Sequence, residues 1–138
     1  MAIATISPKY FLGSFIPNVK ILSAKVDEII NVVNGTTGTV TQGTSRSTAV
    51  TLNTTKGVIT TDTTSLATAT SVVFTINNST VKADSVINAT MNTTNLTGYA
   101  VHFSIESVAA GSFKIRYFNS TGSAITTAVI FNFVVNNN

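Results

Sequence analysis

The sequence predicts an all-β protein: an antiparallel β-sandwich or jelly roll of about eight strands, preceded by an N-terminal arm and one short helix. After Asn34-Gly35, apolar residues alternate with Thr, Asn and Ser, which is the period of half-buried strands. Before that point, apolar residues recur three and four positions apart, which is typical of an amphipathic helix. We therefore divide the chain into an arm (1–17), an oligomerisation helix (18–34) and a β-sandwich domain (35–138).

The helix is expected to begin after Pro17, which suits a first helical turn, and to end at Asn34-Gly35. Two heptads are too short for a stable isolated coiled coil, so its apolar stripe must pack on another copy or on the β-domain of its own chain. We expect self-association; the pattern does not decide between a dimer and a trimer, and of the two we expect the homotrimer. The residues of this apolar seam are Val19, Leu22, Val26, Ile29 and Val33.

The arm contains large apolar residues that no amphipathic element of its own could bury. They must therefore pack on the β-domain, on a sister chain or on a foreign surface. We expect them to dock on a larger scaffold. These residues are Tyr10, Phe11, Leu12, Phe15 and Ile16.

Turn signals divide the rest of the chain into short segments. In the segment 112–118, one face carries Phe113, Ile115 and Tyr117, and the opposite face carries Lys114, Arg116 and Phe118. The last segment is apolar on both faces, so we expect this strand to be central or at an interface. The predicted strands are Thr39–Gln42, Ala49–Asn53, Gly57–Thr61, Ser71–Ile76, Ser85–Asn92, Tyr99–Glu106, Ser112–Phe118 and Ala128–Val135.

Charged residues make up 9% of the chain against a typical value of about 25%, and Thr, Asn and Ser take their place. The net charge of +3 comes from scattered Lys and Arg residues, Arg46 among them, so we expect no nucleic-acid partner. The lack of cysteine excludes disulfides and thiolate metal sites. No signal peptide or membrane span is evident, and we expect no membrane partner.

The inventory of catalytic residues is small, and we expect no enzyme, cofactor or metal. His102 is the one imidazole, and Glu106 on the same strand face lies about 13 Å away, too far for a hydrogen bond. Asp62, Asp84 and Glu106 could converge, but their spacing does not indicate it. Neither clustered carboxylates for calcium nor a phosphate-binding glycine loop is present.

Asn-X-Ser/Thr triplets are frequent, and in a secreted eukaryotic protein they would be glycan acceptors. In an Asn- and Thr-rich chain without a signal peptide, we attribute them to composition. They begin at Asn34, Asn53, Asn77, Asn78, Asn88, Asn92, Asn95 and Asn119.

The segment VTQGTSRSTAVTLN at 40–53, followed by KGVITT at 56–61, resembles the start of the β-domain in small virion proteins of tailed bacteriophages. The segments SVVFTINNSTV (71–81), SVINAT (85–90), AAGSFKIRYFNSTG (109–122) and AVIFNFVV (128–135) fit the same pattern, so the resemblance spans about residues 39–135. It implies a β-sandwich behind an N-terminal anchor, and a structural role in a virion.

Three hypotheses of function follow. The first is a capsid decoration (cement) protein whose arm docks on the major capsid protein or another virion protein. The second is a tail-fibre or head-fibre module that recognises host surface polysaccharide through the loops 77–82, 92–98 and 119–123. The third, a hydrolase on a jelly roll, lacks any constellation of acids or bases. The sequence does not distinguish a location on the capsid shell from a location on the phage tail.

Overall fold

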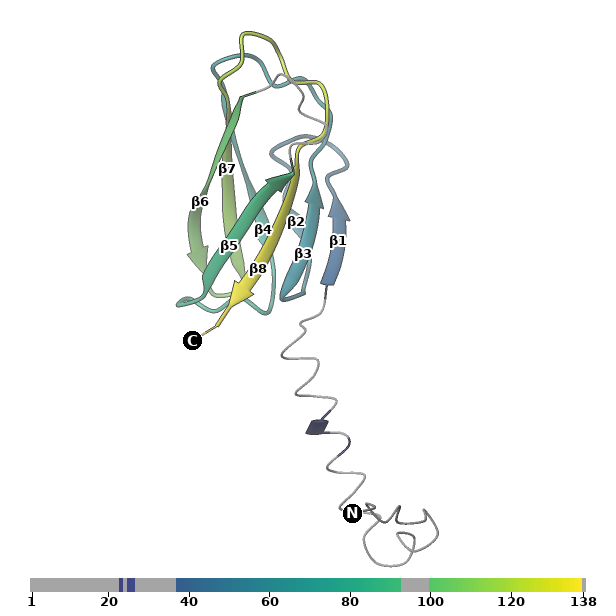
Figure 1. Cartoon of the computed structure of the whole chain (residues 1–138), viewed down its shortest axis with the longest axis vertical. Helices are drawn as coiled ribbons and strands as arrows, with labels where there is room; N and C mark the ends of the chain where they lie inside the picture. The colour runs from purple at the N-terminus through teal and green to yellow at the C-terminus, as the bar shows by residue number, and fades with distance from the viewer. Residues whose placement is uncertain (1–22, 24, 27–36, 93–99, 138) are drawn as a thin grey trace, which may run out of the picture. The chain divides into compact units, whose positions relative to one another are not determined.

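The computed structural model describes residues 23, 25–26, 37–92 and 100–137. The chain forms two units, Met1–Gly35 and Thr36–Asn138, and the second is an all-β domain of two four-stranded sheets (Figure 1). The prediction of an all-β protein with sheets in two layers is confirmed. In the first unit only Ser23, Lys25 and Val26 are described, and they are helical.

All eight predicted strands are present in the β-domain, with ends that differ by a few residues. The second is reduced to two residues, and the ends of the sixth differ most, by two residues at its start and three at its end. The strands are β1 (Thr37–Thr41), β2 (Val50–Thr51), β3 (Lys56–Thr60), β4 (Ser71–Asn77), β5 (Val86–Asn92), β6 (Val101–Ala109), β7 (Ser112–Asn119) and β8 (Ile130–Asn136).

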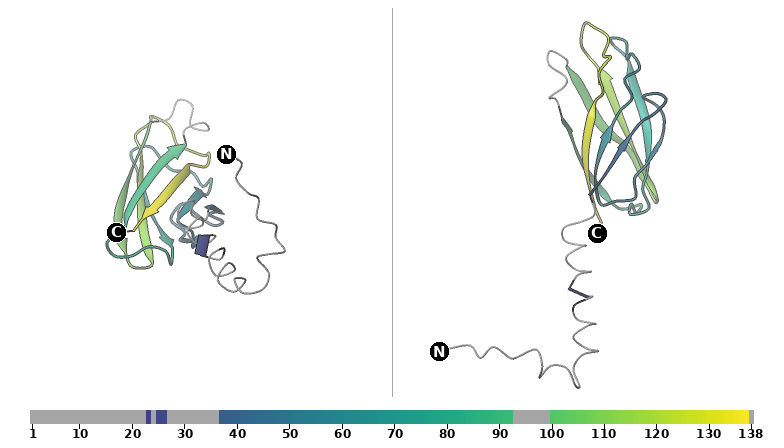
Figure 2. Two further views of the ribbon diagram at one scale, coloured as in Figure 1. Left: turned by 60° about the horizontal axis from the view of Figure 1, so that its bottom comes forward. Right: turned by 90° about the vertical axis from the view of Figure 1, so that its right-hand side faces the viewer.

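The strand order is β1-β3-β8-β5 in one sheet, called sheet A, and β2-β4-β7-β6 in the other, called sheet B. The two sheets form the two layers seen edge-on in Figure 2. The last, doubly apolar strand was predicted to be central or at an interface, and β8 is central, since it lies between β3 and β5.

Four of the strand pairings are antiparallel, but β1 pairs with β3, and β2 with β4, in parallel. The expectation of a purely antiparallel sandwich is wrong at these two edges, and the jelly-roll topology is not confirmed. The reason is that the chain changes sheet after each of its first five strands. Strands that are two apart in sequence therefore become neighbours that run in the same direction; of the successive strands, only β6 and β7 form a hairpin.

Aromatic rings join the two sheets across the core. Phe131 of β8 in sheet A contacts three rings of sheet B, with ring centroids 5.4 Å from Phe103, 5.5 Å from Tyr117 and 6.1 Å from Phe74. Phe113 and Phe133 form a second inter-sheet pair at 5.2 Å. Each buried ring contributes roughly 1.5–3 kcal/mol from the apolar surface it removes from water, so these contacts are a main source of cohesion between the sheets.

Gly57 in β3 makes room for this aromatic packing. It pairs with Phe133 in β8, and a Cβ atom at Gly57 would lie 2.5 Å from Phe133 Cε1 and 2.6 Å from Leu52 Cδ2. Such an approach is shorter than any van der Waals contact, so a larger residue would displace the Phe133 ring from the core.

Arg46 is buried at the end of the domain where β1, β3 and β7 finish. Its side chain is 4% exposed, and each of its five guanidinium N–H groups has an acceptor. Nη1 donates to Thr61 Oγ1 (3.2 Å) and to the Tyr117 hydroxyl (3.5 Å). The remaining bonds go to the backbone carbonyls of Thr64, Ile125 and Thr127. One side chain thus connects the loops 42–49, 61–70 and 120–129 to β7.

Gln42 holds the loop that carries Arg46. Its Nε2 donates to the carbonyls of Arg46 (3.1 Å) and Thr48 (2.7 Å), and its Oε1 accepts from the Asp62 N–H (3.2 Å). Asp62 in turn accepts two hydrogen bonds from Thr64, which lower the pKa of its carboxyl, with a smaller contribution from the charge of Arg46. These bonds hold the loop 42–49 in place and so position the Arg46 guanidinium group for its contacts with the other loops.

Replacing Arg46 with lysine should destabilise the domain by at least about 2 kcal/mol, because one ammonium group cannot reach acceptors spread over two loops and β7, and buried carbonyls lose their donors. Denaturant unfolding of wild type and Arg46→Lys measures the difference. The matched control is Arg116→Lys on the exposed sheet face, where the midpoint should change little. Equal effects of the two substitutions would contradict the role given to Arg46.

The wild-type domain should also lose stability above about pH 10, because burial raises the pKa of the Tyr117 phenol above that of an exposed tyrosine. Between the two pKa values the native state keeps a proton that the unfolded chain has lost, so stability falls as the pH rises. The Tyr117→Phe variant should be less stable than wild type at pH 8, but its stability should fall less than that of wild type when the pH is raised to 11. If denaturant titrations show that both proteins lose the same stability between pH 8 and pH 11, this assignment is refuted.

Candidate functional site

In the described part of the chain, the outer face of sheet B carries the side chains that are best suited to bind or react with a ligand. Strands β6 and β7 run antiparallel there, and their register places His102 opposite Phe118 and Ser104 opposite Arg116. All four residues are exposed, whereas their neighbours Val101 and Tyr117 are buried. The predicted alternation of the two strands is therefore confirmed, and it directs these four side chains to one surface.

Glu106 lies on the same face of β6, at a β-bulge. The register shifts between Ile105 and Ser107, so Glu106 is an extra residue without a partner across the ladder. Its carboxylate accepts two hydrogen bonds of 2.6 Å from Arg116, one from Nε and one from Nη2. This two-point contact fixes the plane of the guanidinium group.

The Arg116 hydrogen bonds lower the pKa of the Glu106 carboxyl, and in return the pKa of Arg116 is raised. Both groups are therefore charged over the ordinary pH range. Because both are exposed, the pair contributes little to the stability of the fold. Its main effect is to hold a donor–acceptor pair in one orientation on the sheet.

A shallow hollow of about 240 Å³ lies beside this ion pair. It is lined by His102, Phe103, Ser104, Arg116 and Phe118. His102 and Ser104 are two apart on one strand face, so their Cα atoms are about 6.6 Å apart. Two polar side chains, one guanidinium group and two aromatic rings therefore border one hollow.

The three acids that could have converged lie apart. Asp62 follows β3 at one end of the domain, Asp84 precedes β5 at the other, and Glu106 is bound to Arg116 on the sheet face. Among the residues that the structure describes, no three His, Cys, Asp or Glu side chains are grouped so as to hold a metal ion.

Two of the three loops proposed as glycan contacts are described, and both direct a polar side chain inward. Asn78 is 1% exposed and donates to the Thr54 carbonyl (2.8 Å); Asn119 is fully buried and donates to the Leu66, Ala67 and Ser123 carbonyls. Of the third loop, 92–98, only Asn92 is described.

The same two asparagines begin Asn-Ser-Thr triplets, and the triplet has a structural role in each. The threonine two residues later donates from both its N–H and its hydroxyl to the asparagine Oδ1, at 2.9 and 2.8 Å for Asn78 and at 2.9 and 2.6 Å for Asn119. Such a turn ties the loop to the asparagine. Buried amides at Asn78 and Asn119 are closed to modification in the folded domain, so at these positions the triplet does more than reflect composition.

The predicted docking and self-association residues lie mostly outside the described residues. None of Tyr10, Phe11, Leu12, Phe15 and Ile16 is described. Of the seam, only Val26 is, and it is helical with 45% of its surface exposed. The predicted arm and seam therefore stay predictions.

Sequence reasoning did not single out the site on sheet B. A signal was present, since Phe118 stands on the polar face of its strand beside Lys114 and Arg116. Its meaning depends on the β6–β7 register, which the sequence did not supply. The sequence also gave no sign that Arg46 is buried, since it is one of several scattered cations.

Comparison of the chain with protein families, curated proteins and solved structures finds no match. In the described residues, no helix has both the length and the apolar character needed to cross a membrane.

Proposed function

We propose that this chain is a structural protein of a bacteriophage virion. Among virion roles, the one we propose is that of a capsid decoration protein. Its arm would dock on the major capsid protein or another virion protein, its seam would gather a homotrimer, and the β-domain would project from the surface. A protein that binds only the assembled shell stabilises that shell by mass action, and several weak arms act together through multivalency.

The structural observation that carries the self-association in this proposal is Val26, the middle residue of the predicted seam. It is helical and exposes 45% of its surface. An apolar side chain displayed on a helix is suited to contact with a second copy, and its sequence neighbours at three- and four-residue spacing continue the stripe.

Two further observations support a structural role. Residues 39–135 resemble small phage virion proteins, as set out above. The described loops are tied to the domain by buried polar side chains, of which Arg46 and Asn119 make the most bonds. A tightly tied domain with few charges is suited to a particle exposed to varying salt and pH, because few of its contacts are screened or titrated.

Deleting residues 1–17 should leave a folded β-domain that no longer binds expanded capsids. Cosedimentation with capsids measures binding, and circular dichroism checks the fold. A truncated protein that still decorates capsids would refute docking through the arm. If the chain is instead a fibre module that recognises polysaccharide, the truncated protein should keep its binding to host cells.

The double substitution Leu22→Asp, Ile29→Asp should dissociate the oligomer, because two carboxylates in the seam lose their hydration on association. Light scattering at micromolar concentration measures the mass of both proteins. The control is Lys25→Asp, which changes charge on the flank of the seam and should leave the mass unchanged. A wild-type monomer under these conditions would refute the seam.

A further inference from the structure

We propose that the outer face of sheet B, at the hollow between β6 and β7, binds a neutral pyranose unit of a polysaccharide. This inference is independent of the virion role proposed above and places the contact on a sheet face rather than on loops. The ligand would stack on Phe118 and form hydrogen bonds to His102, Ser104 and the Arg116–Glu106 pair.

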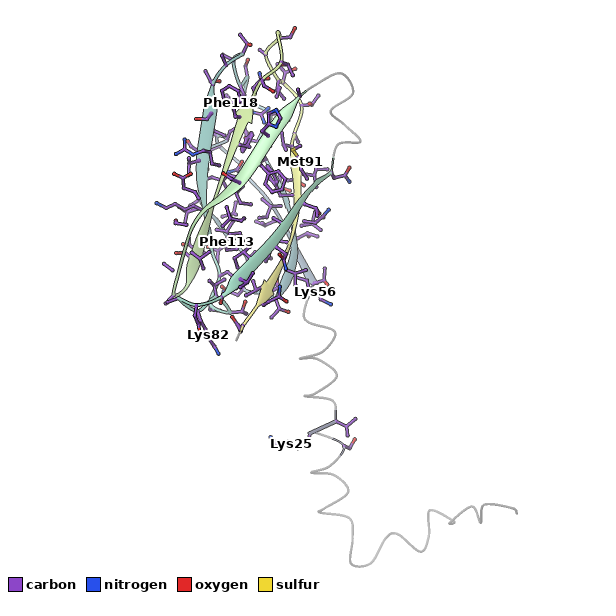
Figure 3. All side chains as sticks on the ribbon, turned by 60° about the vertical axis from the view of Figure 1, so that its left-hand side comes forward. Lys25, Lys56, Lys82, Met91, Phe113 and Phe118 are labelled. Atoms are coloured by element: carbon purple, nitrogen blue, oxygen red, sulfur yellow. The ribbon has the colours of Figure 1, made fainter. Side chains whose placement is uncertain are left out.

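Phe118 supplies the apolar surface. It lies on β7 and is one of the large apolar side chains that the described domain leaves exposed, at 36%; it is labelled in Figure 3. A phenyl face is matched by the apolar C–H face of a pyranose ring, and burial of both surfaces favours contact. His102, directly opposite in the register, borders the same surface.

Arg116 and Glu106 supply a preorganised polar group. Of the five guanidinium N–H groups, Glu106 takes two and the Ser71 hydroxyl a third at 3.5 Å, which leaves two for a ligand. The Glu106 oxygens keep further lone pairs. Adjacent sugar hydroxyls both donate and accept, so they match a fixed donor–acceptor pair at little entropic cost.

Size and charge select the ligand class. The hollow of about 240 Å³ is smaller than the roughly 300–1,000 Å³ typical of sites for drug-sized molecules, so it suits one ring of a chain that continues over the sheet. Arg116 is the charged residue of its lining, and Glu106 neutralises it. Lys114 lies near enough for its charge to act on Glu106, but it does not line the hollow, so the acidic probe described below tests its influence on the choice of sugar.

An NMR titration of the full chain tests this proposal, with maltotetraose, mannotetraose and galactotetraose as probes. We expect at least one to shift the amide resonances of residues 102–104 and 116–118. Phe118→Ala should weaken that binding about tenfold or more, and Phe118→Trp should preserve it. The control Val86→Ala removes an exposed apolar side chain from β5 in sheet A and should leave the affinity unchanged.

The proposal is refuted if none of the three probes shifts these amides, or if Phe118→Ala binds as wild type does. An alginate oligosaccharide is the acidic probe. If alginate binds more tightly than the neutral sugars and Phe118→Ala does not weaken it, the surface recognises charge and the assignment is wrong. Since the variants lie in the β-domain and leave residues 1–34 unchanged, failure here does not affect the proposed arm and seam.

Discussion

The five hydrogen bonds of Arg46 are the constraint on which one end of the β-domain depends. A buried guanidinium group without a carboxylate bound to it is tolerated because each N–H has an oxygen acceptor, most of them backbone carbonyls. Those carbonyls belong to loops that change from one sheet to the other. Fixing these loops fixes where β4 and β8 begin, and so how the two sheets face each other.

The chain's alternation between the two sheets connects the Arg46 hydrogen bonds with the candidate site. Because most successive strands belong to different sheets, the β6–β7 hairpin stands out as a continuous antiparallel surface with long strands. Its inner side supplies Tyr117, which Arg46 contacts, and its outer side supplies Phe118. Packing that holds the inner face rigid therefore also holds the outer face, which is what a preorganised binding surface requires.

Polar side chains with two different roles share this chemically sparse domain. Asn78 and Asn119 are buried and tie loops at opposite ends, whereas Arg116 and Glu106 are exposed and orient one another on the sheet. Buried hydrogen bonds in the first group stabilise the fold because their loss would leave unpaired groups in the core. The exposed pair has little such effect and is available to a ligand.

Local patterns in the sequence were enough to predict the all-β class, eight strands and which face of β7 is buried, because alternation is a local property of each strand. The apolar residues on both faces of β8 predicted a strand either central or at an interface, and the strand order shows that it is central. The parallel pairing of β1 with β3, the burial of Arg46 and the position of His102 opposite Phe118 could be seen only in the folded domain. These depend on loop paths and cross-strand register, which join residues far apart in sequence and leave no periodic trace in it.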